Sequence, residues 1–367
     1  MKKIRLTSIC SPKQWRTIPT KDLLDEGYPV YGANGVIGYC KEYNHTSDTI
    51  IIGCRGSCGN VNIARGKSYI NGNAMCLDDL SSDVDILYLY YFLQNYDFRS
   101  VISGTTIPQV TKQGLEKIDV VVSSKENQRE IVRQLQLLDS IIEERHKELR
   151  YFDALIKSRF IEMFGDPVTN PLRWAMLPLE KCLTVLGGYA FKSEEFKTSG
   201  VPVLRIGNIN TGAFTPTNMV YWSKDDCLTR YQVLPGDLVI SLTGTVGKDD
   251  YGNVCILGNA YHMYYLNQRN AKLILDDELN KHYLSELLKF SQIKKKLTGI
   301  SRGVRQANIS NRDILNLVVP IPPIEIQVQF AAFVEQVDKS KFYIVQMQIL
   351  LRLLIRAIQQ KTTEVLL

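Results

Sequence analysis

Apolar residues recur at alternating steps of four and three positions in two long stretches of the chain, residues 126–164 and 325–365. This spacing is typical of a coiled-coil seam and predicts one long amphipathic helix in each stretch. Because Phe330 corresponds to Ile131, the two seams are 199 positions apart (330 minus 131) and run in the same phase. The first seam comprises Ile131, Leu135, Leu138, Ile142, Leu149, Phe152 and Ile156, and the second comprises Phe330, Val334, Val337, Ile344, Leu351, Ile355 and Ile358.

Polar residues interrupt the two seams at Arg145, Lys341 and Gln348. Such breaks usually set the register of a coiled coil at some cost in stability. A helix of about 38 residues is roughly 57 Å long, which is longer than one domain needs and suits a spacer. The alternatives are helices that pack only on their own domains, or a last helix that serves as an oligomerisation tail. Two copies in phase favour an internal repeat over both alternatives.

The segments that precede the two helices also resemble each other. Residues 28–30 and 201–203 share a Pro between apolar neighbours, and strands predicted at 49–52 and 237–240 each run into a Gly-containing turn. Predicted helices, Gln-containing loops and apolar strands then follow in the same order in both copies: 87–99, Gln109 and 118–122 in the first, and 283–297, Gln306 and 315–319 in the second. The offset grows from 173 to 199 positions, so about 26 extra residues lie in loops of the second copy, where recognition usually occurs.

Composition places the chain among globular proteins. Its 367 residues are 45% hydrophobic and 22% charged, which allows two domains with their own cores and argues against disorder. No apolar run follows Lys2 and Lys3, and no unbroken apolar stretch of membrane length is visible, so we expect a cytoplasmic protein. The eight cysteines are scattered and predict buried free thiols. A zinc site on Cys54, Cys58 and Cys76 is a weak alternative, because a second ligand pair at metal spacing is missing.

The positive charge of the chain is concentrated in one segment. Residues 287–312 carry seven Lys or Arg and no acid, so the remainder of a chain of net charge +6 sums to minus one. Lys294 to Lys296 taken alone predict a solvated helix face. The whole segment, however, includes a loop rich in Gly, Arg, Gln and Asn at 298–308, and these residue types suit phosphates and base edges. The corresponding loop at 103–112 keeps Gly and Gln but lacks Arg, so the two copies are expected to recognise different sequences.

The sequence shows no catalytic motif. Residues 243–248 resemble a phosphate-binding loop only superficially, because Leu242 stands where its first Gly is required and Asp249 follows Lys248. The four histidines lack metal-ligand spacing, and the Asn/Asp-Pro-Pro-aromatic motif of amino-methyltransferases is missing. We therefore expect a recognition protein without an active site, resident metal or cofactor.

The chain resembles the DNA-specificity subunits of type I restriction-modification systems over essentially its whole length. The resemblance rests on the two-fold arrangement, on Pro322-Pro323 with Gln327 at the start of the second helix, and on Met163-Phe164-Gly165-Asp166-Pro167 at the end of the first. The sequence departs from that pattern at Ser123-Ser124, which replace the prolines at the start of the first helix, and at Ile326, which stands where an acid is common.

The resemblance implies an α+β fold with two pseudo-repeated target recognition domains, each mixed α/β, and two long helices packed as an antiparallel coiled coil. The predicted divisions are a first recognition domain at 1–125, a spacer helix at 126–166, a second recognition domain at 167–322 and a C-terminal spacer helix at 323–367. It further implies that each domain recognises one half of a bipartite, asymmetric site in double-stranded DNA. The implied partners are methylation subunits, two in number, which dock on the helices, and restriction/translocase subunits.

We predict two DNA-binding surfaces on this basis. The first consists of Arg55, Ser57, Asn60, Thr105, Thr106, Gln109 and Lys112, and the second of Lys192, Arg205, Asn208, Thr245, Lys248, Arg302, Arg305, Gln306 and Asn308. Apolar residues off the second seam, Met347, Leu350 and Leu354, predict a docking face for partners. The competing hypotheses are a protein-assembly scaffold built on the repeated helices, whose binding is insensitive to salt, and a free-standing enzyme with an unrecognised site.

Overall fold

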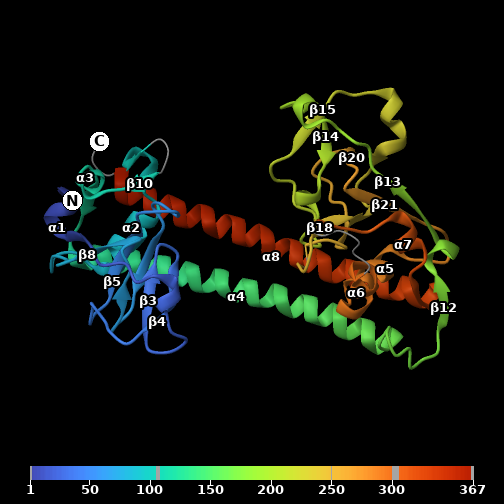
Figure 1. Ribbon diagram of the computed structural model, residues 1–367, viewed down its shortest axis with the longest axis horizontal. Coiled ribbons are helices and arrows are strands. Elements are labelled where there is room, and N and C mark those ends of the chain that lie inside the picture. The colour runs from blue at the N-terminus through green and yellow to red at the C-terminus, as the bar shows by residue number, and fades with distance from the viewer. Residues whose placement is uncertain (1, 105–107, 249, 300–305, 365–367) are drawn as a thin grey trace. The chain divides into compact units, whose positions relative to one another are not determined.

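The computed structural model describes residues 2–104, 108–248, 250–299 and 306–364 (Figure 1). The chain forms two compact units: unit 1 comprises Met1–Lys147 and Ile344–Leu367, and unit 2 comprises Glu148–Tyr343. The predicted long helices are confirmed to within one residue at each end, as α4 (Lys125–Phe164) and α8 (Ile324–Glu364). The division drawn from the sequence separates helices from globular parts, whereas each compact unit includes a segment of both helices. In unit 2 these segments bury apolar side chains in the core of the globular part.

The globular part of unit 1 is built on two small sheets. Its strands are β1 (Lys2–Arg5), β2 (Ser11–Gln14), β3 (Tyr28–Gly32), β4 (Gly35–Cys40), β5 (Thr49–Gly53), β6 (Val61–Ala64), β7 (Tyr69–Ile70), β8 (Ala74–Asp78), β9 (Ile102–Ser103), β10 (Gln109–Val110) and β11 (Asp119–Val122), and its helices are α1 (Leu6–Ile9), α2 (Ile86–Gln94) and α3 (Lys112–Leu115). One sheet is antiparallel throughout, in the order β2-β8-β5-β6. The other has the order β4-β3-β7, with β3 and β7 parallel, and β1 pairs with β11 and β9 with β10.

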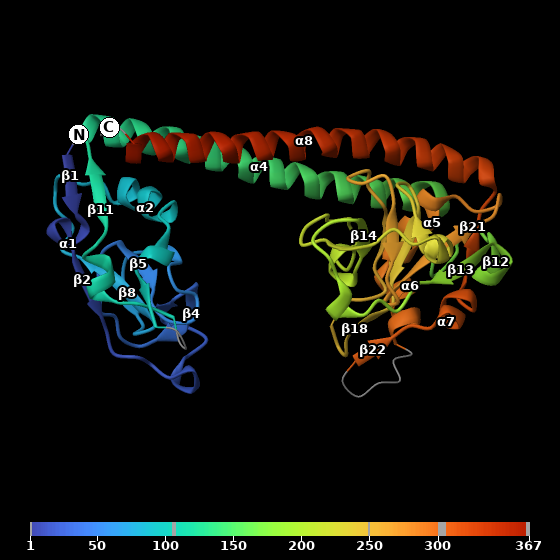
Figure 2. The same cartoon turned by 90° about the horizontal axis from the view of Figure 1, so that it is seen from above.

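Strand β5 is buried on both faces, which explains its unbroken apolar sequence. Ile50 and Ile52 belong to the main core of unit 1 together with Leu89 of α2. Ile51 points to the opposite face, where it packs with Ile70 of the second sheet. Figure 2 shows α2 beside the α4 and α8 segments of the same unit, where the Tyr91 hydroxyl donates to Asp139 of α4 at 2.7 Å.

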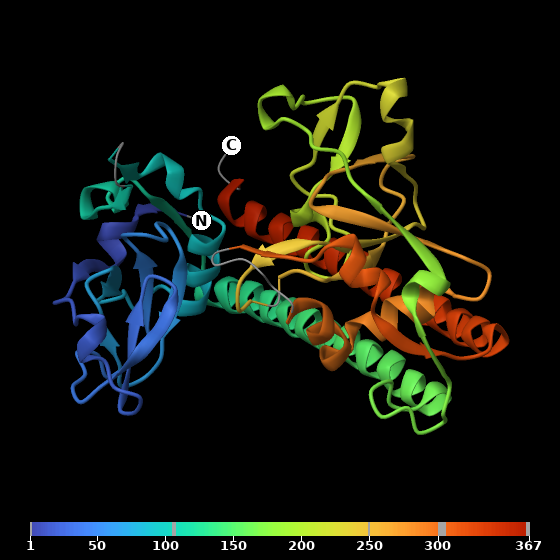
Figure 3. The ribbon, with the colours of Figure 1, turned by 45° about the vertical axis from the view of Figure 1, so that its right-hand side comes forward.

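Unit 2 repeats this arrangement with one more strand in its second sheet. Its strands are β12 (Ala175–Pro178), β13 (Leu183–Gly187), β14 (Val201–Leu204), β15 (Val220–Trp222), β16 (Gln232–Val233), β17 (Leu238–Ser241), β18 (Thr243–Thr245), β19 (Val254–Ile256), β20 (Tyr264–Leu266), β21 (Asn270–Leu275), β22 (Gln306–Asn308) and β23 (Val318–Ile321), and its helices are α5 (Lys281–Lys289), α6 (Ser291–Thr298) and α7 (Asn311–Leu315). The antiparallel sheet has the order β13-β21-β17-β19 and the second sheet the order β15-β14-β20-β16. Figure 3 shows that the second sheet and its loops, in green to yellow, stand away from the α4 and α8 segments of this unit.

The core of unit 2 contains residues from both long helices. Phe160 and Phe164 of α4 pack with Tyr283 of α5 and Phe330 of α8. Toward the other end of these helix segments, the Lys341 ammonium lies 2.6 Å from the carboxylate of Asp153. Within this unit, the segments of α4 and α8 therefore run antiparallel to each other.

A buried glutamine ties the start of each long helix to the globular part of its unit. The Gln128 side chain donates to the carbonyl oxygens of Asp83 and Ser123 and accepts from the amide of Asp85, and none of it is exposed. Its equivalent in unit 2, Gln327, makes the same three bonds, with Glu278, Pro322 and Asn280. The repeat inferred from the sequence thus extends to individual hydrogen bonds.

The predicted seam positions are buried or half-buried along both helices. Two of the polar breaks also face inward: Lys341 is only 23% exposed, and Gln348 is buried with its amide nitrogen lacking a hydrogen-bond partner among the described residues. Within its described length, α8 also holds a window apolar enough, by length and composition alone, to cross a membrane, a test that core helices of globular proteins pass as well. Counting unbroken apolar runs missed this window because polar residues are interspersed in it.

Shorter elements differ from the sequence predictions at their ends. The helix predicted at 87–99 stops at Gln94, and the one predicted at 283–297 is divided at Phe290 into α5 and α6. The strand predicted at 315–319 begins only at Val318, because Leu315 ends α7. These ends depend on capping and tertiary packing, which periodicity does not show.

Candidate nucleic-acid interface

In unit 1, a tight turn of residues 54–60 follows the buried strand β5. The turn is closed by main-chain bonds from Gly59 to Gly53 and from Asn60 to Ser57. Glycine is required at Gly53, where a Cβ atom would lie 2.3 Å from the Ser57 carbonyl oxygen, and at Gly59, whose φ is +84°. The closed main chain leaves the side chains of Arg55 and Asn60 exposed at the surface.

The Gln-containing strand β10 lies against this turn. Gln109 forms a β-bridge with Arg55, and the amide of Val110 donates to the Cys54 carbonyl oxygen at 3.2 Å. The turn and β10 therefore bring together four predicted residues of the first surface, Arg55, Ser57, Asn60 and Gln109, and Lys112 follows them, exposed, at the start of α3. Thr105 and Thr106 lie outside the described residues.

A polar hollow of about 850 Å³ adjoins the turn in unit 1. Ser57 and Asn60 line it from the turn, and Arg352 and Arg356 line it from α8. The two arginines are four positions apart and so share one face of the helix. They were missed in the sequence because α8 was interpreted through its apolar residues alone, as a seam and a docking face; two cations at helical spacing were the available signal.

Unit 2 builds the same juxtaposition with different side chains. β18 pairs with β22 so that Thr243 opposes Asn308, as Arg55 opposes Gln109 in unit 1, and Thr245 opposes Gln306 two residues farther along. The Thr245 amide and hydroxyl donate to Asp250 at 2.8 and 2.9 Å. The hydrogen bond from the Thr245 amide is the main cause that lowers the pKa of Asp250. The bond from the Thr245 hydroxyl and the nearby Lys248 charge act in the same direction, and together these effects outweigh that of burial.

Lys248 and Asn308 are exposed beside this pairing, as predicted for the second surface. Arg302 and Arg305 lie outside the described residues, and of Gln306 only the main chain is described. Both arginines were placed in the second DNA-binding surface from the sequence, and that assignment stays a prediction.

The other predicted residues of unit 2 surround a second hollow, of about 420 Å³. Arg205 lines it and donates to the Asn218 carbonyl oxygen at 2.6 Å, while the exposed Lys192 at its edge pairs with Glu195 at 3.3 Å. Asn208 requires a correction as a DNA contact. Its side chain is only 3% exposed, and it donates to two carbonyl oxygens and accepts from the Arg205 amide, so it stabilises its own loop.

Arg269 is a candidate that the sequence analysis missed. It is exposed and lines the hollow of unit 2. Its carbonyl oxygen accepts from the amide of Leu242, which begins the turn after β17. In unit 1 the equivalent bond joins Cys54 to Asn73, so Arg269 occupies the position of Asn73. The signal was its place in the amide-rich sequence Asn267-Gln268-Arg269-Asn270 between two apolar strands.

The basic segment is less uniformly exposed than its sequence indicates. Lys289 pairs with Glu286 at 2.5 Å, and Lys294 is buried with its ammonium 2.6 Å from the Asn253 side-chain oxygen. The prediction of a solvated helix face is therefore wrong for Lys294, and it is confirmed for Lys295 and Lys296. Lys294 faces inward because α6 packs its buried face on the core of unit 2.

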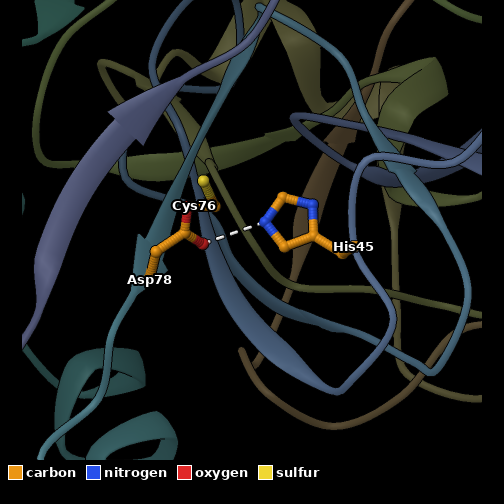
Figure 4. Close-up of side chains that lie close together, drawn as sticks. All are labelled: His45, Cys76 and Asp78. Carbon is orange, nitrogen blue, oxygen red and sulfur yellow. Dashed lines mark hydrogen bonds and ion pairs between the residues drawn. The ribbon is translucent and has the colours of Figure 1, made fainter.

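The thiols are mostly buried, as predicted: six of the eight cysteines are buried, Cys58 is half-buried and Cys227 is exposed. The structure does not group Cys76 with Cys54 and Cys58. Among the described residues, the potential metal ligands that come together are His45, Cys76 and Asp78 of unit 1 (Figure 4). Burial, followed by the charge of Asp78, raises the pKa of the Cys76 thiol to about 12.

Comparisons with known proteins agree with this arrangement. The model of the type I restriction modification DNA specificity domain matches residues 1–150 and 171–353. The specificity subunit of the type I restriction enzyme MjaVIII from Methanocaldococcus jannaschii is 26% identical over 297 residues, which cover 74% of this chain and 68% of that protein. A putative type I restriction enzyme specificity subunit from Haemophilus influenzae is 22% identical over 330 residues, covering 84% and 80%.

A solved structure shows the same fold. The S subunit of the type I restriction-modification system from M. genitalium superposes with a TM-score of 0.55 at 18% identity, covering 98% of this chain and 95% of that one. The family match spans most of both units, which confirms the resemblance found in the sequence. The chain therefore belongs to the family of type I restriction-modification DNA-specificity subunits, whose task is DNA sequence recognition and not catalysis.

Proposed function

We propose that each unit recognises one half of a bipartite, asymmetric site in double-stranded DNA. One observation carries this proposal: the pairing of a turn with a strand that carries an amide side chain recurs in both units with different side chains, Arg55 with Gln109 and Thr243 with Asn308. Arg suits guanine edges and Gln suits adenine, whereas Thr contacts either base or a thymine methyl group. A constant frame with unlike side chains is suited to two unlike half-sites.

The long helices are proposed to form an antiparallel coiled coil that fixes the gap between the half-sites. In unit 2, the Phe160 contact with Phe330 and the Asp153 contact with Lys341 support antiparallel packing. In dimeric DNA-binding proteins, geometry of this kind sets the spacing of half-sites in helical turns of roughly 34 Å. Here one chain would take the place of the dimer, so its two half-sites need not be palindromic.

We further propose that two methylation subunits dock on the helices and that restriction/translocase subunits join this complex. The predicted docking residues are exposed apolar side chains: Met347 at 47%, Leu350 at 64% and Leu354 at 49%. Apolar side chains grouped on one helix are costly to leave in water and mark a surface for partners. A cytoplasmic location, where such a complex meets DNA, is part of the same proposal.

The test is single-molecule methylation sequencing of the host genome with and without the gene. We expect a split motif, two unequal halves around a fixed gap, to lose its methylation when the gene is deleted. A genome whose modified motifs are all unaffected contradicts the proposal, provided that the partner methylase is expressed.

The scaffold alternative is distinguished by salt. Binding dominated by phosphate contacts weakens steeply as salt concentration rises, with a slope that reports the number of phosphates neutralised. We expect this dependence for the purified complex on duplex DNA. A salt-independent association with protein partners alone would support the scaffold.

A further inference from the structure

His45, Cys76 and Asp78 form a compact cluster within unit 1. Cys76 and Asp78 lie in β8, and His45 lies in the connection between β4 and β5, where its main chain pairs with Ser68. The candidate ligand atoms, the His45 ring nitrogen, the Cys76 sulfur and an Asp78 oxygen, all lie within 4.8 Å of one another. In Figure 4 the imidazole ring and the Asp78 carboxylate point toward each other, with the sulfur beside them.

The hydrogen bonds around Asn44 determine which ring nitrogen of His45 carries a proton. The Asn44 side-chain oxygen accepts from the Ile70 amide at 2.8 Å, and its nitrogen donates to the Ile70 carbonyl oxygen at 3.1 Å. These two bonds fix the orientation of the side-chain amide. The same Asn44 oxygen lies 2.7 Å from His45 Nδ1, so Nδ1 must be the donor in that contact.

In a neutral His45 with a proton on Nδ1, the other nitrogen, Nε2, presents a lone pair. Nε2 lies 2.9 Å from the Asp78 Oδ1 atom. The carboxylate of Asp78, ionised at neutral pH, accepts hydrogen bonds and cannot donate one. Two acceptors at this distance repel unless a cation lies between them, and that cation is either a proton or a metal ion.

We propose that unit 1 binds a divalent transition-metal ion, with zinc as the favoured ion, through His45 Nε2, the Asp78 carboxylate and the Cys76 thiolate. Imidazole nitrogen, carboxylate oxygen and thiolate sulfur are the ligands that zinc takes in proteins. A ligating histidine typically donates its other N–H to a fixed oxygen, which is the role of Asn44 here. This set of neutral and anionic donors balances a charge of +2.

The surroundings of the sulfur and of Asp78 both favour and oppose this role, because the Cys76 thiol donates to the Lys13 carbonyl oxygen at 3.0 Å and would lose that bond on binding a metal ion. The Trp15 indole N–H donates to the Cys76 sulfur at 3.2 Å, a bond that a thiolate accepts more strongly than a thiol. A hollow of about 750 Å³ is lined by His45 and Asp78 and leaves room for water as the fourth ligand. Lys13 also lines this hollow, with its ammonium 4.0 Å from the centre of the Trp15 ring. Its positive charge opposes metal binding to some degree.

At the position equivalent to Cys76, unit 2 carries a lysine. In the central strands, Ile51 pairs with Cys76 as Val239 pairs with Lys272, so Lys272 is the equivalent of Cys76. The Lys272 ammonium lies 2.6 Å from the Asp237 carboxylate. Each unit thus places a carboxylate beside this strand, and unit 1 lacks the lysine that neutralises it in unit 2. A metal ion in unit 1 would pin the β4–β5 connection to β8.

The experiment measures zinc bound to the purified full chain after dialysis against zinc and then against metal-free buffer. We expect about one zinc ion per chain. Cobalt(II) should bind in its place and give a thiolate-to-cobalt charge-transfer absorption in the near ultraviolet. The variants C76S, H45Q and D78N should each lose most of the zinc, and C76S should also lose the charge-transfer absorption.

The matched control is C10S. Cys10 is a buried thiol of the same unit whose pKa is likewise raised to about 12, and it lies outside the cluster. Zinc content that is unchanged in C10S and lost in the three variants, all folded by circular dichroism, supports the proposal. A chain that binds no zinc, or equal zinc in C76S, H45Q and D78N, overturns it. In that case nitrogen NMR of the His45 ring should find a proton on both nitrogens, which identifies an imidazolium–carboxylate pair.

Discussion

Unit 1 and unit 2 share a frame of hydrogen bonds but anchor the far ends of the long helices differently. In unit 2, Phe160 of α4 is fully buried and contacts the rings of Tyr283, Phe290 and Phe330. The residue 199 positions later is Gln359 of α8, which donates to the Tyr91 carbonyl oxygen in unit 1. Unit 2 therefore holds the end of α4 by aromatic packing, whereas unit 1 holds the end of α8 by a side-chain amide. A repeated topology thus does not imply equal stability.

The recognition turns differ in the same way. The frame keeps the turn after the central strand and its pairing with an amide side chain, Gln109 or Asn308, while the turn residue opposite that amide changes from Arg55 to Thr243. The requirements for folding are met by the main chain and by buried residues. The exposed side chains are therefore free to change with the recognised DNA.

The largest effect is expected for Phe160→Ala. Removing a fully buried ring with several aromatic neighbours should destabilise unit 2 by about 3 to 5 kcal/mol. The matched change in unit 1, Gln359→Ala, removes one hydrogen bond and should cost about 1 kcal/mol. Hydrogen exchange followed by mass spectrometry measures both, because it assigns the loss of protection to peptides of each unit. Equal losses in the two units would contradict the asymmetry.

A smaller effect, similar in both units, is expected for the buried glutamines. Gln327→Met leaves the Asn280 amide and two carbonyl oxygens without their partner and should destabilise unit 2 by about 2 to 3 kcal/mol. Gln128→Met should have the same effect on unit 1. Gln336→Met, at an exposed position of α8, is the control and should change little. If urea unfolding shows a large loss of stability in one unit only, the two buried glutamines do not contribute equally to the stability of their units.

The sequence was sufficient for features that periodicity records. The seam positions of α4 and α8, the buried strands β5 and β17 and the repeat itself follow from apolar spacing. It was not sufficient where tertiary packing decides: Lys294 faces the core, Asn208 bonds its own loop, and Arg352 reaches a hollow lined by residues far away in the chain. His45 joins Cys76 and Asp78 only through the fold, so its spacing in the sequence gave no metal signal.

The DNA contacts allow a test of the comparison between turns. If Arg55 recognises a guanine, Arg55→Ala should cost about 1 to 3 kcal/mol at one base pair of one half-site, as should Arg302→Ala or Arg305→Ala in the other half-site. Lys248→Ala, if Lys248 contacts a phosphate, should weaken binding to all sequences equally and reduce the salt slope by about 1. Competition binding with singly substituted sites measures both. Lys21→Ala, at an exposed lysine outside both predicted surfaces, is the control. A uniform loss for Arg55→Ala would reassign it to a phosphate.

The smallest effect is a pH dependence that His282 is expected to give to unit 2. Burial, followed by the charge of Lys281, lowers the pKa of His282 below its usual 6.5, although Glu335 at 3.4 Å, Asp338 and Glu286 act in the opposite direction. The unfolded chain therefore binds a proton at His282 more readily than the folded chain does, and unit 2 should lose stability as pH falls below about 6.5. His282→Gln should reduce this loss between about pH 6.5 and 5, before most carboxylates titrate. In unit 1 the residue equivalent to His282 is Leu87, because Tyr88 and Tyr283 donate equivalent hydrogen bonds to the carbonyl oxygens of Val121 and Pro320. The α2 peptides around Leu87 therefore serve as the internal reference. Hydrogen exchange across this pH range, corrected for the intrinsic exchange rate, measures the difference; a loss of protection in unit 2 that persists in the His282→Gln variant would assign the effect to another group.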